Sequence, residues 1–174
     1  MSPSADELTG EVIREFVHLL EQSRHKIHHC LNQLAQEQLW WRPQPELNSI
    51  GNLILHLCGN LNQWAVSGVT RTPDGREREA EFRSDHDHTR AELLLMLDQV
   101  VKRACDVMQA LSAGDLLEPR TIQGFSVSVL GAISHTVPHF VGHTHQIIYL
   151  TRLQLGEKYQ FDWSPDAQRG GVPI

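Results

Sequence analysis

The sequence predicts an all-α fold, an antiparallel type of four-helix bundle, and three observations lead to it. Apolar residues recur every three or four positions through four long segments, at about residues 6–36, 49–66, 86–111 and 126–155. That spacing gives each segment one apolar face, which a helix buries against its neighbours. None of the segments shows a strand pattern, and the long connection between the second and third helices permits a crossover topology.

Composition narrows the class of protein. The 174 residues are enough for one domain, so residues 1–174 are expected to form a single helical bundle. A mean hydropathy of −0.32, with no apolar run near the ~20 residues of a membrane span, argues against a membrane protein. Fifteen basic against 21 acidic residues give a net charge of −6, which disfavours a nucleic-acid partner. The acidic N-terminus lacks the features of a signal peptide, and the three cysteines are scattered, so we expect a cytoplasmic protein with reduced thiols.

The first helix is expected to run from Asp6 to about Gln36. Its apolar face is formed by Val12, Ile13, Phe16, Leu20, Ile27, Leu31 and Leu34. Three histidines, His18, His25 and His29, lie on the other side of the helix. That position favours solvated or interface histidines over a surface metal site.

The second helix begins after a proline-containing stretch, with Asn48 or Ser49 as its N-cap. Its buried face is formed by Ile50, Leu53, Ile54, Leu57, Leu61 and Trp64. His56 lies on the flank of that face, with Asn60 one turn further on. Taken alone, a histidine on such a flank is more often a packed residue than a ligand.

The third helix follows a polar, charged loop over residues 68–85, of the kind that either covers a site or has no ordered position. Ser84 or Asp85 is expected to cap this helix. Its core stripe is formed by Leu93, Leu97, Val100, Val101, Ala104, Met108 and Leu111. His86 and His88 are two positions apart, so on a helix they point in different directions and a shared metal is disfavoured.

The fourth helix carries four histidines and follows a connector in which residues 118–122 are expected to be extended. At ~100° per residue, His139 and His143 lie one turn apart on the same stripe, whereas His135 and His145 diverge from it. Two imidazoles at this spacing suit a metal, although the glutamate of the zinc-protease motif H-E-x-x-H is absent. A hydrogen-bonded histidine pair is the alternative interpretation.

His56 supplies a third imidazole, and together with His139 and His143 it favours a divalent metal site. Three neutral imidazoles leave a coordination position open, as in catalytic rather than structural sites. Zinc or nickel suits imidazole ligands best, and manganese or iron is also compatible. Three amide side chains are either contacts around the metal or merely polar residues on the flanks of the bundle: Asn60, Gln63 and Gln146.

The back of the fourth helix is unusually poor in charged residues. It carries Gly131, Ser134, Pro138, Gly142, Tyr149 and Leu153. Since a solvated face would normally be polar, we expect a homodimer that uses this face. The alternative is that the aromatic tail around Phe161 and Trp163 folds back over it within one chain.

The stretch NSIGNLILHLCGNLNQW, followed by HFVGHTHQIIYLTRL, resembles the DinB-like superfamily and in particular its DUF1572-type branch. The resemblance runs from about Leu39 to Trp163 and includes the pairs Arg42-Pro43 and Glu81-Phe82. It departs from the family pattern at His145, which stands where a glycine often precedes the glutamine.

This resemblance implies a four-helix bundle, often dimeric, in which three histidines hold a divalent metal; they map onto His56, His139 and His143. Relatives with known activities are transferases or isomerases that use low-molecular-weight thiols. The expected function is therefore a metal-dependent enzyme, in particular an S-transferase that joins such a thiol to an electrophilic small molecule. The alternatives are a non-catalytic metal-binding stress-response protein and a metal-dependent hydrolase.

Overall fold

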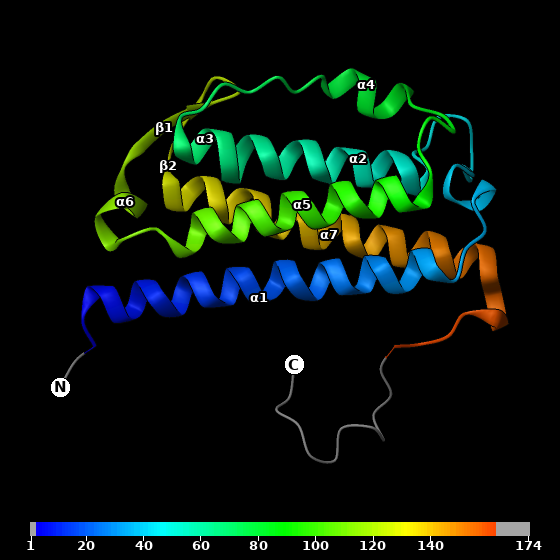
Figure 1. Cartoon of the computed structure of the whole chain (residues 1–174), viewed down its shortest axis with the longest axis horizontal. Helices are drawn as coiled ribbons and strands as arrows, with labels where there is room; N and C mark the ends of the chain where they lie inside the picture. Colours follow the sequence, from blue (N-terminus) through cyan, green and yellow to red (C-terminus); the bar gives the residue numbers. More distant parts are fainter. Residues whose placement is uncertain (1–2, 163–174) are drawn as a thin grey trace, which may run out of the picture.

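The computed structural model describes residues 3–162, so the part of the predicted aromatic tail from Trp163 onward lies outside it. Within this range four long helices lie side by side in one bundle (Figure 1). They are α1 (Ala5–Asn32), α2 (Ile50–Leu61), α5 (Arg90–Gln109) and α7 (Val129–Leu155). α1 packs on α5 and α7, and α2 packs on the same two helices. The predicted all-α four-helix bundle is confirmed, with one small β-hairpin added.

The second helix is longer than predicted and changes its geometry along the way. Ser49 is the N-cap, because its hydroxyl accepts a hydrogen bond from the Asn52 amide at 3.2 Å. After Leu61 the chain forms a π-helical turn, Asn62–Ser67, and then the short α3 (Gly68–Thr70). The helix ends at Arg71, whose φ of 61° is left-handed.

The third helix begins four residues later than predicted, at Arg90, and its cap is neither Ser84 nor Asp85. Thr89 caps it in a reciprocal pair with Glu92: the Glu92 carboxylate accepts from the Thr89 amide at 2.7 Å, and the Thr89 hydroxyl accepts from the Glu92 amide at 3.3 Å. His86 has a φ of 58°, which a continuing helix does not allow. The preceding loop contains a short helix, α4 (Arg78–Arg83), that lies over α2 (Figure 1).

Two other helix ends also differ from prediction. α1 ends at Asn32 rather than near residue 36, and a 3₁₀ turn at Glu37–Leu39 follows. α7 begins at Val129 rather than residue 126, with Ser128 as its N-cap, because residues 125–128 form a strand.

That strand, β2 (Phe125–Ser128), pairs antiparallel with β1 (Pro119–Ile122), with Ile122 opposite Phe125. The extended piece expected before the fourth helix is thereby confirmed. Gln123 and Gly124 join the strands with φ of 53° and 82°, the positive values that a two-residue hairpin turn requires. The hairpin follows the short helix α6 (Ala113–Leu117) and contacts α3 and α7.

The predicted apolar faces form one continuous core between the four helices. Most predicted members are fully buried, while Val12, Phe16 and Leu111 are partly exposed. All three cysteines are buried free thiols. Over the described residues, none of the helices is apolar for long enough to cross a membrane.

Candidate functional site

Three histidines from two helices meet on one side of the core. His56 projects from α2, and His139 and His143 project from successive turns of α7. The Nε2 atoms of His56 and His139 are 3.0 Å apart, and one ring nitrogen of each of the three lies within 4.8 Å of the others. His56 is buried and the other two are partly exposed, so the cluster lies at the edge of the core.

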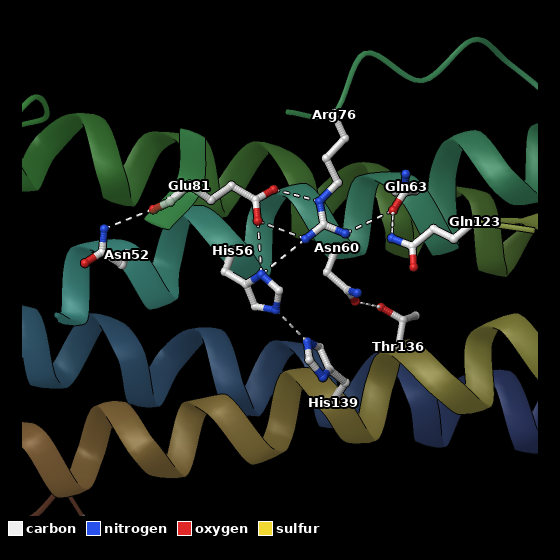
Figure 2. Close-up of polar contacts among 9 residues, drawn as sticks. All are labelled: Asn52, His56, Asn60, Gln63, Arg76, Glu81, Gln123, Thr136 and His139. Carbon is white, nitrogen blue, oxygen red and sulfur yellow. Dashed lines mark hydrogen bonds and ion pairs between the residues drawn. The ribbon is translucent and has the colours of Figure 1, made fainter. Parts of the chain in front are cut away.

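Residues of the loop before α5 cover the His56 side of this cluster. α4 places Glu81 against the ring of His56, with Oε2 3.0 Å from Nδ1 (Figure 2). Arg76 binds the same carboxylate in a bidentate way, with Nε 2.6 Å from Oε1 and Nη2 2.9 Å from Oε2. Burial acts to raise the pKa of Glu81, but the hydrogen bonds from Arg76 and His56 outweigh it and the pKa is lowered. Glu81 is therefore a buried anion.

These contacts determine which nitrogen of each histidine is free. Nδ1 of His56 lies 3.0 Å from Oε2 of Glu81, which only accepts, and 3.2 Å from Nη2 of Arg76, which only donates. With the proton on Nδ1, the ring donates to the carboxylate at the shorter distance, and Arg76 keeps its two bonds to Glu81. His143 is arranged in the same way, because its Nδ1 lies 2.9 Å from Oε1 of Gln146. In both rings this tautomer leaves the lone pair on Nε2, the atom that a metal would bind, and Nε2 of His56 lies 3.0 Å from Nε2 of His139.

The pKa values of His139 and His143 are both lowered, which favours the neutral form of these two rings. Burial is the main cause that lowers the pKa of His139, with repulsion from His143 and His56 adding to it, and the value falls to about 4. Burial also lowers the pKa of His143. Because metals bind only neutral imidazole, these lowered pKa values favour metal binding by His139 and His143 at neutral pH.

Close packing fixes the roof formed by Arg76 and Glu81. A Cβ atom at Gly59 would clash with Oε1 of Glu81 and lie 2.9 Å from Nε of Arg76, so a side chain there would have to push this ion pair aside. Asn52 fastens α4 to α2, since its amide donates to the carbonyl oxygens of Glu81 at 3.0 Å and of Ser84 at 2.8 Å.

A chain of polar contacts then runs from Arg76 to the hairpin. Nη1 of Arg76 donates to Oε1 of Gln63 at 3.0 Å, and the Gln123 amide donates to the same oxygen (Figure 2). Gln63 in turn donates to Asp74 in the loop. Loop, π-helical turn and hairpin are thus tied together beside the cluster.

Comparison with known proteins identifies the family. A family model described as a protein of unknown function, DUF1572, matches residues 7–164. The chain belongs to the DUF1572 family. Two solved structures share its fold, each with a TM-score of 0.64. One is a DinB-like protein, YjoA, from Bacillus subtilis, at 12% identity, with 87% of this chain and 99% of that chain covered. The other is a DinB-like protein from Bacillus cereus, at 16% identity, with 80% and 90% covered. No curated protein matches the chain.

The predicted membership of the DUF1572 family is therefore confirmed, and the chain shares the fold of two DinB-like proteins. The three histidines expected to converge do so, and the other histidines lie elsewhere. His135 is exposed and contacts Trp64, with ring centroids 4.2 Å apart and the rings tilted by 40°, and His145 is exposed. In α1, His18 and His25 are exposed, while His29 contacts the carbonyl oxygen of Gln160.

The sequence left open whether Asn60, Gln63 and Gln146 are contacts around the metal or merely polar residues on the flanks of the bundle. The structure places two of them at the cluster and one away from it. Gln146 contacts His143, and Gln63 contacts Arg76, so both belong to the surroundings of the cluster. Asn60 instead accepts a hydrogen bond from the hydroxyl of Thr136 at 2.7 Å and joins the two helices.

Sequence reasoning missed the role of Arg76 and Glu81. The loop from Arg71 to Arg83 contains eight charged side chains, and their order does not show which two turn inward. The one available signal was the Glu81-Phe82 pair of the DUF1572 resemblance. Of the two expectations for this loop, covering the site is the one that the structure shows.

Proposed function

We propose that this DUF1572 protein is a divalent-metal-dependent enzyme whose metal is held by His56, His139 and His143. The observation that carries the proposal is the convergence of three imidazoles, with their ring nitrogens within 4.8 Å of one another. The donor set fits such an ion: at a tetrahedral zinc with Zn–N bonds of ~2.0–2.1 Å, ligand nitrogens are about 3.3 Å apart. The 3.0 Å between Nε2 of His56 and of His139 needs only a small adjustment.

The metal would supply Lewis acidity and an open coordination position for a substrate atom. The chain's own residues prepare the ligands. Glu81 orients the His56 ring, Gln146 orients His143, and Arg76 keeps Glu81 ionised and in place. Zinc or nickel is the proposed ion because imidazole suits both, with manganese or iron as further candidates.

For the reaction we propose transfer of a low-molecular-weight thiol to an electrophilic carbon, the chemistry implied by the resemblance to DinB-like transferases. The thiol gives its proton to solvent, its sulfur bonds to the carbon, and the bond from that carbon to the leaving group breaks, with the electron pair departing on the leaving group. The thiol has to come from solution, because burial raises the pKa of Cys58 to about 12 and of Cys105 to about 11. Burial raises the pKa of Cys30 as well, so the chain's own thiols are poor nucleophiles.

Two alternatives remain from the sequence. A hydrolase needs a base to activate water, and Glu81, which contacts His56, is already held by Arg76 and faces Nδ1 rather than Nε2. Because Glu81 is not free to act as a base, the structure also supports the second alternative, a metal-binding stress-response protein without turnover.

The test is to load the protein with zinc or nickel and to assay it with cysteine or glutathione and 1-chloro-2,4-dinitrobenzene. Metal-dependent loss of thiol, abolished in His139→Ala and retained in His145→Ala, supports the enzyme. Stoichiometric metal without thiol consumption, over a panel of electrophiles, would leave the binding protein as the function.

A further inference from the structure

A small cavity of about 230 Å³ lies between the π-helical turn, the hairpin and α7. It is lined by Trp64, Gln123, Phe125, Val127 and His135. Three of these are aromatic rings, and none is a carboxylate, lysine or arginine. The cavity thus differs in kind from the larger one of about 710 Å³ behind α4, whose lining includes Arg83, Asp87 and Arg103.

The cavity is next to the histidine cluster. His135, in its wall, lies one turn of α7 before His139, and the two rings are nearly parallel, at 11°, with centroids 6.1 Å apart. Gln123 at its rim belongs to the polar chain that reaches Arg76 and, through Glu81, His56. One ring of the cavity wall thus lies 6.1 Å, centroid to centroid, from a ring of the cluster, and a molecule bound at the cluster can extend past it towards the cavity.

Trp64, which forms one wall of the cavity, is unusual both in its backbone geometry and in its hydrogen bonding. The residue lies in the π-helical turn, a geometry that occurs often at functional sites. Its side chain is 97% buried, yet its Nε1–H finds no hydrogen-bond acceptor anywhere in residues 3–162. An unpaired buried donor is costly, so its retention calls for a reason beyond packing.

The wall is also held firmly. Trp64 packs with Ile122 of the hairpin and Ala132 of α7. At Gly68 a Cβ atom would lie 2.4 Å from Cδ1 of Ile122, so the hairpin approaches the helix as closely as glycine allows. Phe125 on the opposite side is 62% exposed, which leaves its ring free to contact a ligand.

We propose that this cavity is an aryl subsite, which holds an aromatic group of the substrate while a polar atom of the same molecule reaches the metal. Its volume is below the ~300–1,000 Å³ of pockets that enclose a whole ligand, so it suits one arm of a molecule. Indole, phenyl and imidazole walls favour an aromatic ring through stacked and edge-to-face contacts. The inference rests on the proposed metal site and adds the substrate class: aryl compounds with a short link to a metal-binding or electrophilic group.

The experiment uses the full chain loaded with Co²⁺, whose visible spectrum reports ligands that enter the coordination sphere. Phenylacetate and 3-phenylpropionate are titrated against acetate and propionate, which present the same carboxylate without the ring. We expect the aryl acids to bind about tenfold more tightly, the upper range for a well-placed aromatic contact. Phe125→Ala should remove this preference, Phe125→Trp should keep it, and Leu95→Ala, at a similarly exposed apolar residue on α5, should not change it.

The outcomes separate this proposal from the one on which it rests. Absence of stoichiometric Co²⁺ binding would overturn the metal site and the subsite together. Normal Co²⁺ binding with equal affinity for aryl and alkyl acids would overturn the subsite alone. A tenfold aryl preference that survives in Phe125→Ala would also overturn it, because the ring would then be bound elsewhere.

Discussion

Glu81→Gln is the change that isolates the role of the roof over the histidine cluster. It keeps the size of the side chain and removes the charge that His56 and Arg76 share. A neutral amide can present its NH₂ group to Nδ1 of His56, which would then accept and leave its proton on Nε2, the atom meant for the metal. The geometry of the helices is unchanged, so an effect on metal affinity would come from ring orientation and tautomer.

Glu81→Gln should have two separate effects, one on zinc affinity and one on the stability of the fold. Loss of a partner that orients a metal-bound histidine costs about 10–100-fold in affinity, or about 1.4–2.7 kcal/mol. Arg76 has a side chain that is 4% exposed, so removing its counter-charge should also destabilise the fold, by about 3 kcal/mol or more. Zinc affinity is therefore measured by chelator competition at a temperature where circular dichroism shows the variant to be folded.

Glu79→Gln is the matched control, since Glu79 lies in the same short helix, its side chain is 87% exposed, and it pairs with Arg83 on the surface. It should leave both zinc affinity and stability unchanged, because exposed ion pairs contribute little. Zinc binding by folded Glu81→Gln at wild-type affinity would refute the assignment of Glu81 as the residue that orients His56.

Three further predictions concern packing, pH and assembly. Gly59→Ala should weaken zinc binding, because the new Cβ would displace Glu81, and chelator competition against Gly114→Ala, where a Cβ meets nothing closer than 3.8 Å, checks this. The free energy of unfolding of the metal-free protein should fall between pH 6.5 and about 4, because the unfolded chain takes up a proton at His139 that the folded protein refuses until about pH 4. Allowing for partial exposure, that loss is about 1–2 kcal/mol in urea titrations, and a slope unchanged in His139→Ala would contradict its origin. The protein should sediment as a homodimer and Gly142→Arg as a monomer of unchanged helix content, since a Cβ at Gly142 meets no other segment of residues 3–162 within 4 Å; a monomeric wild type at tens of micromolar would contradict the dimer.

The face of α7 that is proposed to form the dimer is exposed in the structure. Tyr149 and Leu153, on the predicted back of the fourth helix, are 66% and 52% exposed. The described part of the tail does not bury them: Tyr159 packs edge-on against His29, and Phe161 is 65% exposed beside Arg152. The face therefore stays open in one chain as far as Asp162.

Periodicity predicted the parts of the fold that are set by burial of apolar side chains. The stripes of the four helices depend on spacing alone, and the same spacing places His139 and His143 on one face. His56 could be added because it flanks the buried face of its own helix. These three residues meet because two regular helices pack together, which the sequence pattern encodes directly.

The parts that failed depend on contacts between segments distant in sequence. The roof is placed by Asn52, whose amide holds two loop carbonyls about 30 residues away. The start of the third helix was misplaced because Ser84 and Asp85 are good caps by type, whereas the left-handed backbone at His86 stops a helix there. The first residues of the predicted fourth helix form a strand, since Val127 packs with Trp64 and Ile122 rather than continuing the helix.

Metal analysis of the purified protein is the decisive test of whether His56, His139 and His143 hold one metal ion. Wild-type protein and the double variant His135→Ala, His145→Ala, purified without added metal and then dialysed against zinc, should each retain about one ion per chain by mass spectrometry. The double variant His56→Ala, His139→Ala, with the same number of histidines removed, should retain none. Full occupancy in this last variant would contradict the account.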